Sequence, residues 1–169
     1  MVALPDMPDM PVPEVDSVEH TLTYYEGFTR KVWTNNEEMF FPEGYLITSR
    51  TDLKGYITHA NEAFVVMSGW DESDLIGSRH SILRHPDMPK VAYKGLWDDV
   101  QAGKKWHGYV KNLRKNGGFY WVYATIIPNV RDGKIIGYTS VRRQPSRKKI
   151  EELSKVYAQL KAEEQGGTA

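Results

Sequence analysis

Alternating apolar and polar residues in the second half of the chain predict three long β-strands, at 106–114, 119–128 and 135–143. An Asn-Gly pair stands in the first connection and an Asp-Gly pair in the second, and both are typical of tight hairpin turns. These three strands should therefore be antiparallel neighbours in one sheet.

The first half of the compact region predicts shorter elements. Strands are expected at 45–50 and 56–59, and Asn61 can cap a short helix formed by the residues that follow it. A longer helix is marked by apolar residues at helical spacing, namely Val91, Leu96, Trp97 and Val100. Two short strands, several short helices and three long strands form an α+β pattern.

The compact domain is predicted to span 44–145, with two segments ahead of it. The proline-rich residues 1–15 should be extended or disordered, and residues 16–43 should form an amphipathic helix and a linker. We expect this helix to pack on its own domain or to form a dimer contact. The stripe that predicts it consists of Val18, Leu22, Tyr25, Phe28 and Val32.

Residues 146–169, after the domain, are predicted to form an exit helix with a short tail, capped by Ser146. The apolar residues of this helix form a seam with steps of three and four residues, which favours a signalling helix or a dimer contact. A helix folded back on its own domain would fit the same seam nearly as well. Arg142 and Arg143, just before it, are expected in a solvated linker. The seam consists of Ile150, Leu153, Tyr157 and Leu160.

Composition narrows the class of protein. The 22 basic residues balance 22 acidic ones, so no general attraction to nucleic acid is expected. The sequence has no cysteine, which excludes disulfides, thiolate metal sites and cysteine catalysis. No apolar run approaches the roughly 20 residues that span a bilayer, and the acidic, proline-rich start is unlike a signal peptide. We therefore expect a soluble, cytoplasmic protein without a membrane segment.

Two neighbouring motifs carry the candidate chemistry. The first is the sequence RHPDMP at 84–89, in which the forked side chain of Arg84 suits a diphosphate. The second is the strand that follows it, whose inward row presents a large ring, a gap, an aliphatic side chain and an amide. Such a row suits a flat heterocycle that needs a hydrogen bond. Its members are Trp106, Gly108, Val110 and Asn112.

Both motifs resemble the flavin-binding sensor domain of bacterial aerotaxis receptors, a branch of the PAS family. The resemblance implies a five-stranded antiparallel sheet with short helices on one face that enclose a cofactor pocket, flanked here by N- and C-terminal helices. It also implies non-covalent FAD, a redox- or oxygen-sensing role, a signalling output domain or partner protein, and a homodimer. The cofactor-binding residues would be Asn61, Arg84, His85, Asp87, Tyr93, Trp97, Trp106 and Asn112.

Within that resemblance, Arg84, His85 and Asp87 would hold the polar part of FAD, and Trp106 and Asn112 would contact its ring system. Tyr93 stands where the family has Phe. The light-sensing branch of the family forms a flavin–cysteine adduct, which a chain without cysteine cannot form.

Other functions stay open at this point. PAS domains can bind haem through one histidine, for which His80 or His85 would serve. A small flavin electron carrier and a cofactor-free PAS interaction module are the remaining alternatives. The sequence shows no catalytic pair and no metal-ligand spacing, so we expect neither an enzyme nor a metal site.

Overall fold

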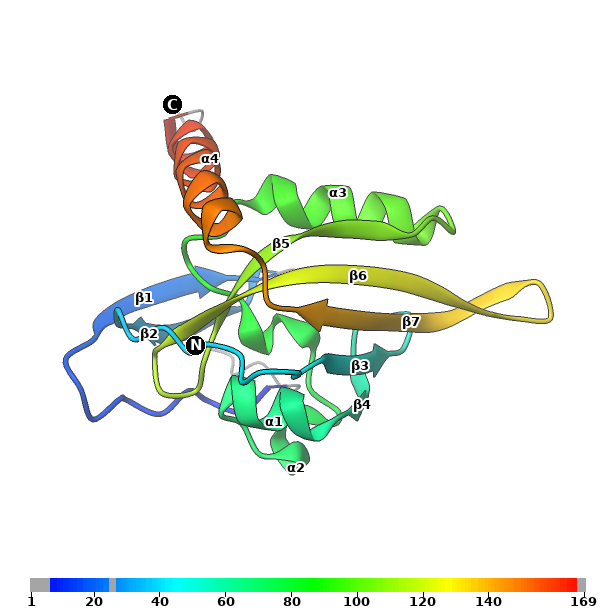
Figure 1. Ribbon diagram of the computed structural model, residues 1–169, viewed down its shortest axis with the longest axis horizontal. Helices are drawn as coiled ribbons and strands as arrows, with labels where there is room; N and C mark the ends of the chain where they lie inside the picture. Colours follow the sequence, from blue (N-terminus) through cyan, green and yellow to red (C-terminus); the bar gives the residue numbers. More distant parts are fainter. Residues whose placement is uncertain (1–6, 25–26, 167–169) are drawn as a thin grey trace.

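The computed structural model describes residues 7–24 and 27–166 (Figure 1). Within the described residues, four strands are followed by a run of helices, then by three longer strands and a final long helix. In chain order the elements are β1 (Val18–Thr23), β2 (Thr29–Thr34), β3 (Ile47–Thr51), β4 (Ile57–Ala60), α1 (Glu62–Ser68), α2 (Glu72–Leu75), η2 (His80–Leu83), α3 (Lys90–Gln101), β5 (Trp106–Leu113), β6 (Phe119–Arg131), β7 (Lys134–Arg143) and α4 (Arg147–Gly166).

Five strands form one antiparallel sheet in the order β4-β3-β7-β6-β5. The three long strands pair as consecutive hairpins, as the sequence predicts, and Gly117 and Gly133 in the turns have φ of 87° and 75°. Glycine adopts such left-handed angles without steric cost. The prediction of an α+β fold with a five-stranded antiparallel sheet is confirmed.

The two faces of this sheet are covered differently. Residues of β6 alternate, so that Tyr120, Val122 and Ala124 join the main hydrophobic core on the inner face. Phe64 of α1 and Leu75 of α2 are fully buried in the same core. The opposite, outer face is the one that α4 crosses. The inner face of the sheet is therefore the one that the short helices cover, and a PAS pocket is expected between this face and those helices.

The predicted N-terminal amphipathic helix is wrong. Strands β1 and β2 form a separate two-stranded antiparallel sheet, with Leu22 opposite Arg30 and His20 opposite Val32 (Figure 1). Tyr25, part of the predicted stripe, lies outside the described residues. Val18 and Leu22 of the stripe lie four residues apart in β1, and a step of four also satisfies the two-residue alternation of a strand. A pattern that fits both periods does not distinguish helix from strand.

Residues 7–15, part of the segment expected to be extended or disordered, form no helix or strand. They are nevertheless held against the domain, because Met7 and Met10 are buried. The predicted domain limits, 44 and 145, stay a prediction.

Helix α4 folds back on its own domain. Ser146 caps it, since its Oγ accepts a hydrogen bond from the Lys149 amide at 3.2 Å. At its far end, a carboxylate oxygen of Glu164 accepts a hydrogen bond of 3.0 Å from the Val91 amide, in the first turn of α3. Of the three arrangements left open by the sequence, the structure has the folded-back helix.

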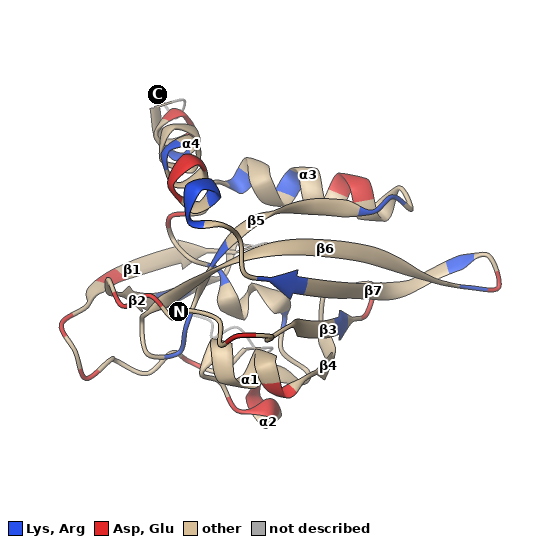
Figure 2. Cartoon of the chain, viewed as in Figure 1, with Lys and Arg blue, Asp and Glu red and all other residues tan. Residues whose placement is uncertain are grey.

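None of the helices within the described residues has the length and apolar character to cross a membrane. Basic and acidic side chains are interspersed along the chain, with both signs on α3 and on α4 (Figure 2). This distribution matches the balanced composition.

Candidate functional site

The predicted inward row of β5 lies on the inner face. Trp106 and Val110 pack against the main core, and Asn112 is 5% exposed. The gap expected at Gly108 is filled by a neighbour, because a Cβ atom there would overlap the Trp106 ring. The glycine therefore lets the Trp106 ring lie along the strand.

The RHPDMP motif runs beside β5, which is one of the two edge strands of the five-stranded sheet. Arg84 forms an antiparallel bridge with Asn112, so these two side chains share the inner side of β5. The Arg84 guanidinium lies 5.3 Å from the ring centre of Tyr93 on α3. The structure thus brings together three of the predicted cofactor residues.

The rest of the motif turns to the other side of β5. His85 packs edge-on against Phe119, with ring centres 6.2 Å apart, and its Nδ1 accepts a hydrogen bond from the Asp87 amide at 3.0 Å. Asp87 forms an ion pair of 2.8 Å with Lys111, on the outer side of the strand. The structure therefore does not place Arg84, His85 and Asp87 in one cluster, and their joint hold on a cofactor stays a prediction.

Burial and the charges nearby determine how these groups titrate. Burial, and then the positive charge of Lys111, lower the pKa of His85 from 6.5 to about 3. Burial alone would raise the pKa of Asp87, but the hydrogen bond from Lys111 and the positive charge of Lys111 lower it below its ordinary value. At neutral pH, His85 is neutral and Asp87 is ionised.

Two further predicted residues have structural partners. Trp97 of α3 meets Tyr138 of β7 edge-on at 5.8 Å. Asn61 caps α1, where its Oδ1 accepts hydrogen bonds from the amides of Phe64 and Thr48, both at 3.1 Å. Its Nδ2 donates to the Leu46 carbonyl at 2.8 Å. These backbone contacts explain Asn61 without a ligand, and its role in cofactor binding stays a prediction.

The most unusual group on the inner face is Arg142, which was expected in a solvated linker but is 2% exposed. Its guanidinium donates to Ser49 Oγ at 2.6 Å and to His80 Nε2 at 3.1 Å, and it lies 4.4 Å from the centre of the Phe64 ring. Burial lowers the pKa of Arg142 to about 10, so it is charged at neutral pH. Within the described residues, no carboxylate forms an ion pair with it.

The neighbours of Arg142 are neutral. Burial, and then the positive charge of Arg142, lower the pKa of His80 from 6.5 to about 3. Arginine can only donate, so His80 Nε2 must be the acceptor in their contact. This use of Nε2 competes with a role for His80 as a haem ligand.

Two buried polar atoms close to this cluster have no hydrogen-bond partner in the described structure: Nε of Arg142 and the hydroxyl of Tyr120. Burial raises the pKa of Tyr120 to about 12. The amide of Asn112, opposite Tyr120 in the sheet, acts to lower that pKa, although the two side chains lie outside ordinary hydrogen-bond geometry. A buried donor without an acceptor is costly, so such atoms are candidate ligand contacts.

Sequence reasoning missed this cluster. Arg142 stands two residues after Ser140 and four after Tyr138, and all three side chains are buried. That alternation would have placed Arg142 on the inner face, had the pairing of β7 with β3 and β6 been known. The cue that misled was its neighbour Arg143, which is exposed.

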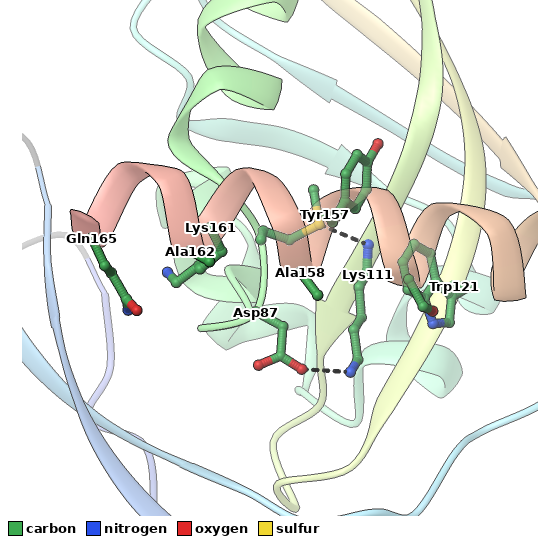
Figure 3. Close-up of a pocket in the computed structure, with 10 residues that line it drawn as sticks. Asp87, Lys111, Trp121, Tyr157, Ala158, Lys161, Ala162 and Gln165 are labelled. Carbon is green, nitrogen blue, oxygen red and sulfur yellow. Dashed lines mark hydrogen bonds and ion pairs between the residues drawn. The ribbon is translucent and has the colours of Figure 1, made fainter. Parts of the chain in front are cut away.

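A cavity of about 330 Å³ lies on the other side of the sheet, beneath α4 (Figure 3). Its floor includes the Asp87–Lys111 ion pair and Trp121, which stacks on Tyr157 of α4 with ring centres 6.1 Å apart. The cavity is lined by Asp87, Met88, Lys111, Trp121, Ser154, Tyr157, Ala158, Lys161, Ala162 and Gln165. It touches only the outer part of the RHPDMP motif and none of the inner-face residues.

The part of the chain that the structure describes contains no group of three or more His, Cys, Asp or Glu residues arranged to hold a metal ion. The candidate site is therefore the inner-face cluster around Arg142, Asn112 and Arg84.

Comparison with known proteins identifies the fold. A family model described as PAS fold matches residues 57–142, slightly more than half of the chain. The sequence is 47% identical to the aerotaxis receptor of Escherichia coli (strain K12) over 116 residues, which cover 69% of this chain. It is 28% identical to the nitrogen fixation regulatory protein of Klebsiella pneumoniae over 99 residues, 58% of this chain. The chain belongs to the PAS family.

By their names, these two relatives are a receptor and a regulatory protein. Among solved structures, the light-state structure of the blue-light photoreceptor Aureochrome1 LOV matches with a TM-score of 0.57 and 20% identity, over 71% of this chain and 91% of that one. This match supports the fold. The chain spans 23% of the length of the aerotaxis receptor and 20% of that of the nitrogen fixation regulatory protein.

Proposed function

We propose that this chain is a flavin-binding PAS sensor domain. It holds FAD non-covalently in the cytoplasm, detects redox state or oxygen, and passes the signal to an output domain or partner protein, as a homodimer. The likeness to the aerotaxis receptor motivates the sensing role. The observation that carries the proposal is the buried, charged Arg142, which has neutral partners and one unpartnered N–H group.

The residues on the inner face fit a flavin in several respects. Flavin rings are flat and carry hydrogen-bond acceptors along one edge, and Trp106 and Phe64 supply apolar contact area nearby. Nε of Arg142 and the hydroxyl of Tyr120 are buried donors in need of acceptors. Arg84, on the same side of β5 as Asn112, supplies a second cation for the phosphate groups.

A bound flavin would supply a reversible redox change that alters charge and hydrogen bonding at the ring edge. This chain's residues would respond to that change. Arg142 favours any state in which the ring edge is negatively charged, because burial weakens the competing interaction of the guanidinium with water. Asn112 must change its hydrogen bonds when the acceptor pattern changes.

The response has a short path to α4. Arg142 lies near the end of β7, and Ser146, which caps α4, follows four residues later. A shift of the Arg142 side chain can therefore alter the start of α4 through the strand itself. For signalling, the two redox states must favour two protein conformations to different extents. The substitution Asn112→Ala tests the part of Asn112 in starting this response, since unchanged flavin content together with an unchanged response of the protein to flavin reduction would exclude it.

The first experiment is the visible absorption spectrum of the purified protein, followed by anaerobic reduction and exposure to air. A flavin spectrum that bleaches and returns is the expected result. A sharp Soret band would instead indicate haem. A protein that is colourless after incubation with FAD and removal of the unbound FAD would leave the cofactor-free interaction module, in which the Trp106 ring stays packed over Gly108. Sustained oxidation of NAD(P)H would indicate an electron carrier.

Arg142→Gln then tests the key residue in the flavin-loaded protein. Loss of a nearby positive charge makes the negatively charged reduced state less favourable, so the midpoint potential should become more negative. A tenfold preferential loss of affinity for the reduced form corresponds to about 30 mV for a two-electron couple. Arg143→Gln is the matched control, because it removes the adjacent, exposed arginine. Equal potentials in the two variants would contradict the role of Arg142.

A further inference from the structure

The N-terminal hairpin β1–β2 is anchored to the sheet domain although it lies outside the residues that match the family, 57–142. Arg30 of β2 donates a hydrogen bond of 2.8 Å to the Pro8 carbonyl, which ties the hairpin to the segment before it. Val32 and Met10 form a small buried cluster with Leu113 at the end of β5. The hairpin thus covers one end of the sheet, beside the strand that carries Asn112.

Two side chains of this N-terminal segment reach the main core. Met7 and Tyr24 belong to the same buried cluster as Phe64 and Tyr120 of the inner face. The sulfur of Met7 accepts a weak hydrogen bond of 3.7 Å from Ser81, in η2 just before the RHPDMP motif. The segment therefore contributes to the interior in which the candidate site lies.

Tyr24 is the most informative of these residues. It is 7% exposed, and its hydroxyl is buried without a hydrogen-bond partner in the described structure. Its ring centre lies 5.9 Å from the Arg84 guanidinium, which also faces the ring of Tyr93. A phenylalanine would fill the same space without a hydroxyl, so the Tyr24 hydroxyl calls for an acceptor, and the described residues do not provide one.

Arg84 indicates what that acceptor is. Aromatic rings contact a guanidinium through its face, whereas phosphate oxygens bind its in-plane N–H groups, so both contacts are compatible at one arginine. A phosphate held by Arg84 would present further oxygens close to the Tyr24 hydroxyl. A neutral O–H donor beside a guanidinium is a favourable arrangement for a phosphate group.

We propose that Tyr24 is a phosphate-binding residue of the cofactor site, so that the N-terminal hairpin completes the site instead of merely covering the domain. The ligand class is a flavin carrying a phosphate group, and the inference rests on the flavin-binding function proposed above. It predicts that the hydroxyl of Tyr24 discriminates between flavins with and without phosphate.

The test is a set of equilibrium titrations of cofactor-free protein with riboflavin, FMN and FAD, followed by flavin fluorescence. Tyr24→Phe keeps the ring and removes only the hydroxyl. We expect its dissociation constants for FMN and FAD to rise roughly tenfold, the size expected for a hydrogen bond to a charged group, and that for riboflavin to change less than about twofold. Tyr109→Phe, on the outer side of β5, is the matched control and should change none of the three.

The outcomes separate the two proposals. Flavin binding by the wild type, with no change or an equal change for all three ligands in Tyr24→Phe, would overturn the phosphate-binding role and leave the flavin proposal standing. A wild-type protein that binds none of the three would overturn the proposed function and this inference with it. Thermal unfolding of the cofactor-free variant, expected to match that of the wild type, identifies any loss of affinity caused by misfolding.

Discussion

The two faces of the central sheet bury polar groups in different ways. On the inner face, Arg142 and Tyr120 keep polar atoms without partners in the described structure. On the outer face, the Tyr157 hydroxyl of α4 donates a 2.6 Å hydrogen bond to the Tyr109 carbonyl, and Lys111 pairs with Asp87. The outer face is thus satisfied by a segment of the same chain, whereas the inner face has donors in excess.

This difference separates a binding face from a packing face. Polar groups in a finished protein interior are nearly all hydrogen-bonded, so unpaired ones point to a missing partner. The lining of the cavity beneath α4 contains the Asp87–Lys111 ion pair and the stacked rings of Trp121 and Tyr157, and it gives no comparable reason to expect a ligand (Figure 3). Four perturbations test the contrast, and they are ordered here by expected effect.

Phe64→Ala should have the largest effect, because it removes a fully buried ring that packs against Arg142 and His80 on the inner face. We expect the free energy of unfolding to fall by about 3–5 kcal/mol, the usual cost of a large cavity in a core. Urea denaturation measures it. Val66→Ala removes an exposed side chain from the same helix, and a comparable loss in that variant would contradict the assignment of the inner face.

Acidification should destabilise both faces through their histidines. The pKa values of His80 and His85 are lowered to about 3 in the folded protein, so below pH 6.5 the unfolded chain binds more protons than the folded one. The stability from each histidine is complete above pH 6.5 and is lost progressively as pH falls towards 3. At pH 5 each should have lost about 2 kcal/mol relative to pH 7.

Unfolding free energies at pH 7 and pH 5 check this expectation. His85→Gln should show a smaller difference between the two pH values than the wild type. His59→Gln changes an exposed histidine and should keep the wild-type difference. A wild-type stability independent of pH over this interval would show that neither histidine is held neutral by the fold.

Tyr157→Phe should have a smaller effect, confined to the outer face. It removes the hydrogen bond to the Tyr109 carbonyl and keeps the ring that stacks on Trp121. We expect a loss of about 1 kcal/mol in the stability of α4 docking, the typical value for one hydrogen bond. Amide hydrogen exchange along α4 is the measurement. Val156→Ala, at an exposed neighbouring position, should leave the exchange unchanged, and equal exchange in all three proteins would argue against the contact.

Arg147→Gln should have the smallest effect. Arg147 pairs with Glu38 at 2.9 Å, but the arginine side chain is 48% exposed, so solvent screens the interaction. A coupling energy below about 1 kcal/mol is expected from a double-mutant cycle with Glu38→Gln. A larger coupling would mean that the start of α4 is fixed by charge instead of by packing.

The sheet could be predicted from the sequence because its information is local. Two hairpin turns with glycine and the two-residue alternation of the long strands were sufficient to predict β5, β6 and β7. The hairpin β1–β2 was not predicted, because its apolar spacing satisfies helix and strand alike. Short segments with an ambiguous period are decided by their tertiary partners, here Leu113 and the main core.

The candidate site was predicted only in part for a similar reason. Trp106 and Asn112 were placed on the inner side by alternation, and Arg84 was placed near them by the motif. Arg84 lies on the inner side of β5, whereas His85 and Asp87 lie on its outer side. This arrangement depends on the bridge between Arg84 and Asn112, which no local sequence pattern reveals. The burial of Arg142 likewise depends on β7 pairing with both β3 and β6.

The hydrogen bond between Glu164 and the Val91 amide couples α4 to α3 in local unfolding. The first amides of a helix have no partner within it, and here one of them donates to a carboxylate on α4 that lies 73 residues further along the chain. When α4 detaches, α3 loses that bond at its first turn. The two helices should therefore behave as one cooperative unit in local unfolding, with the start of α3 losing protection whenever α4 does.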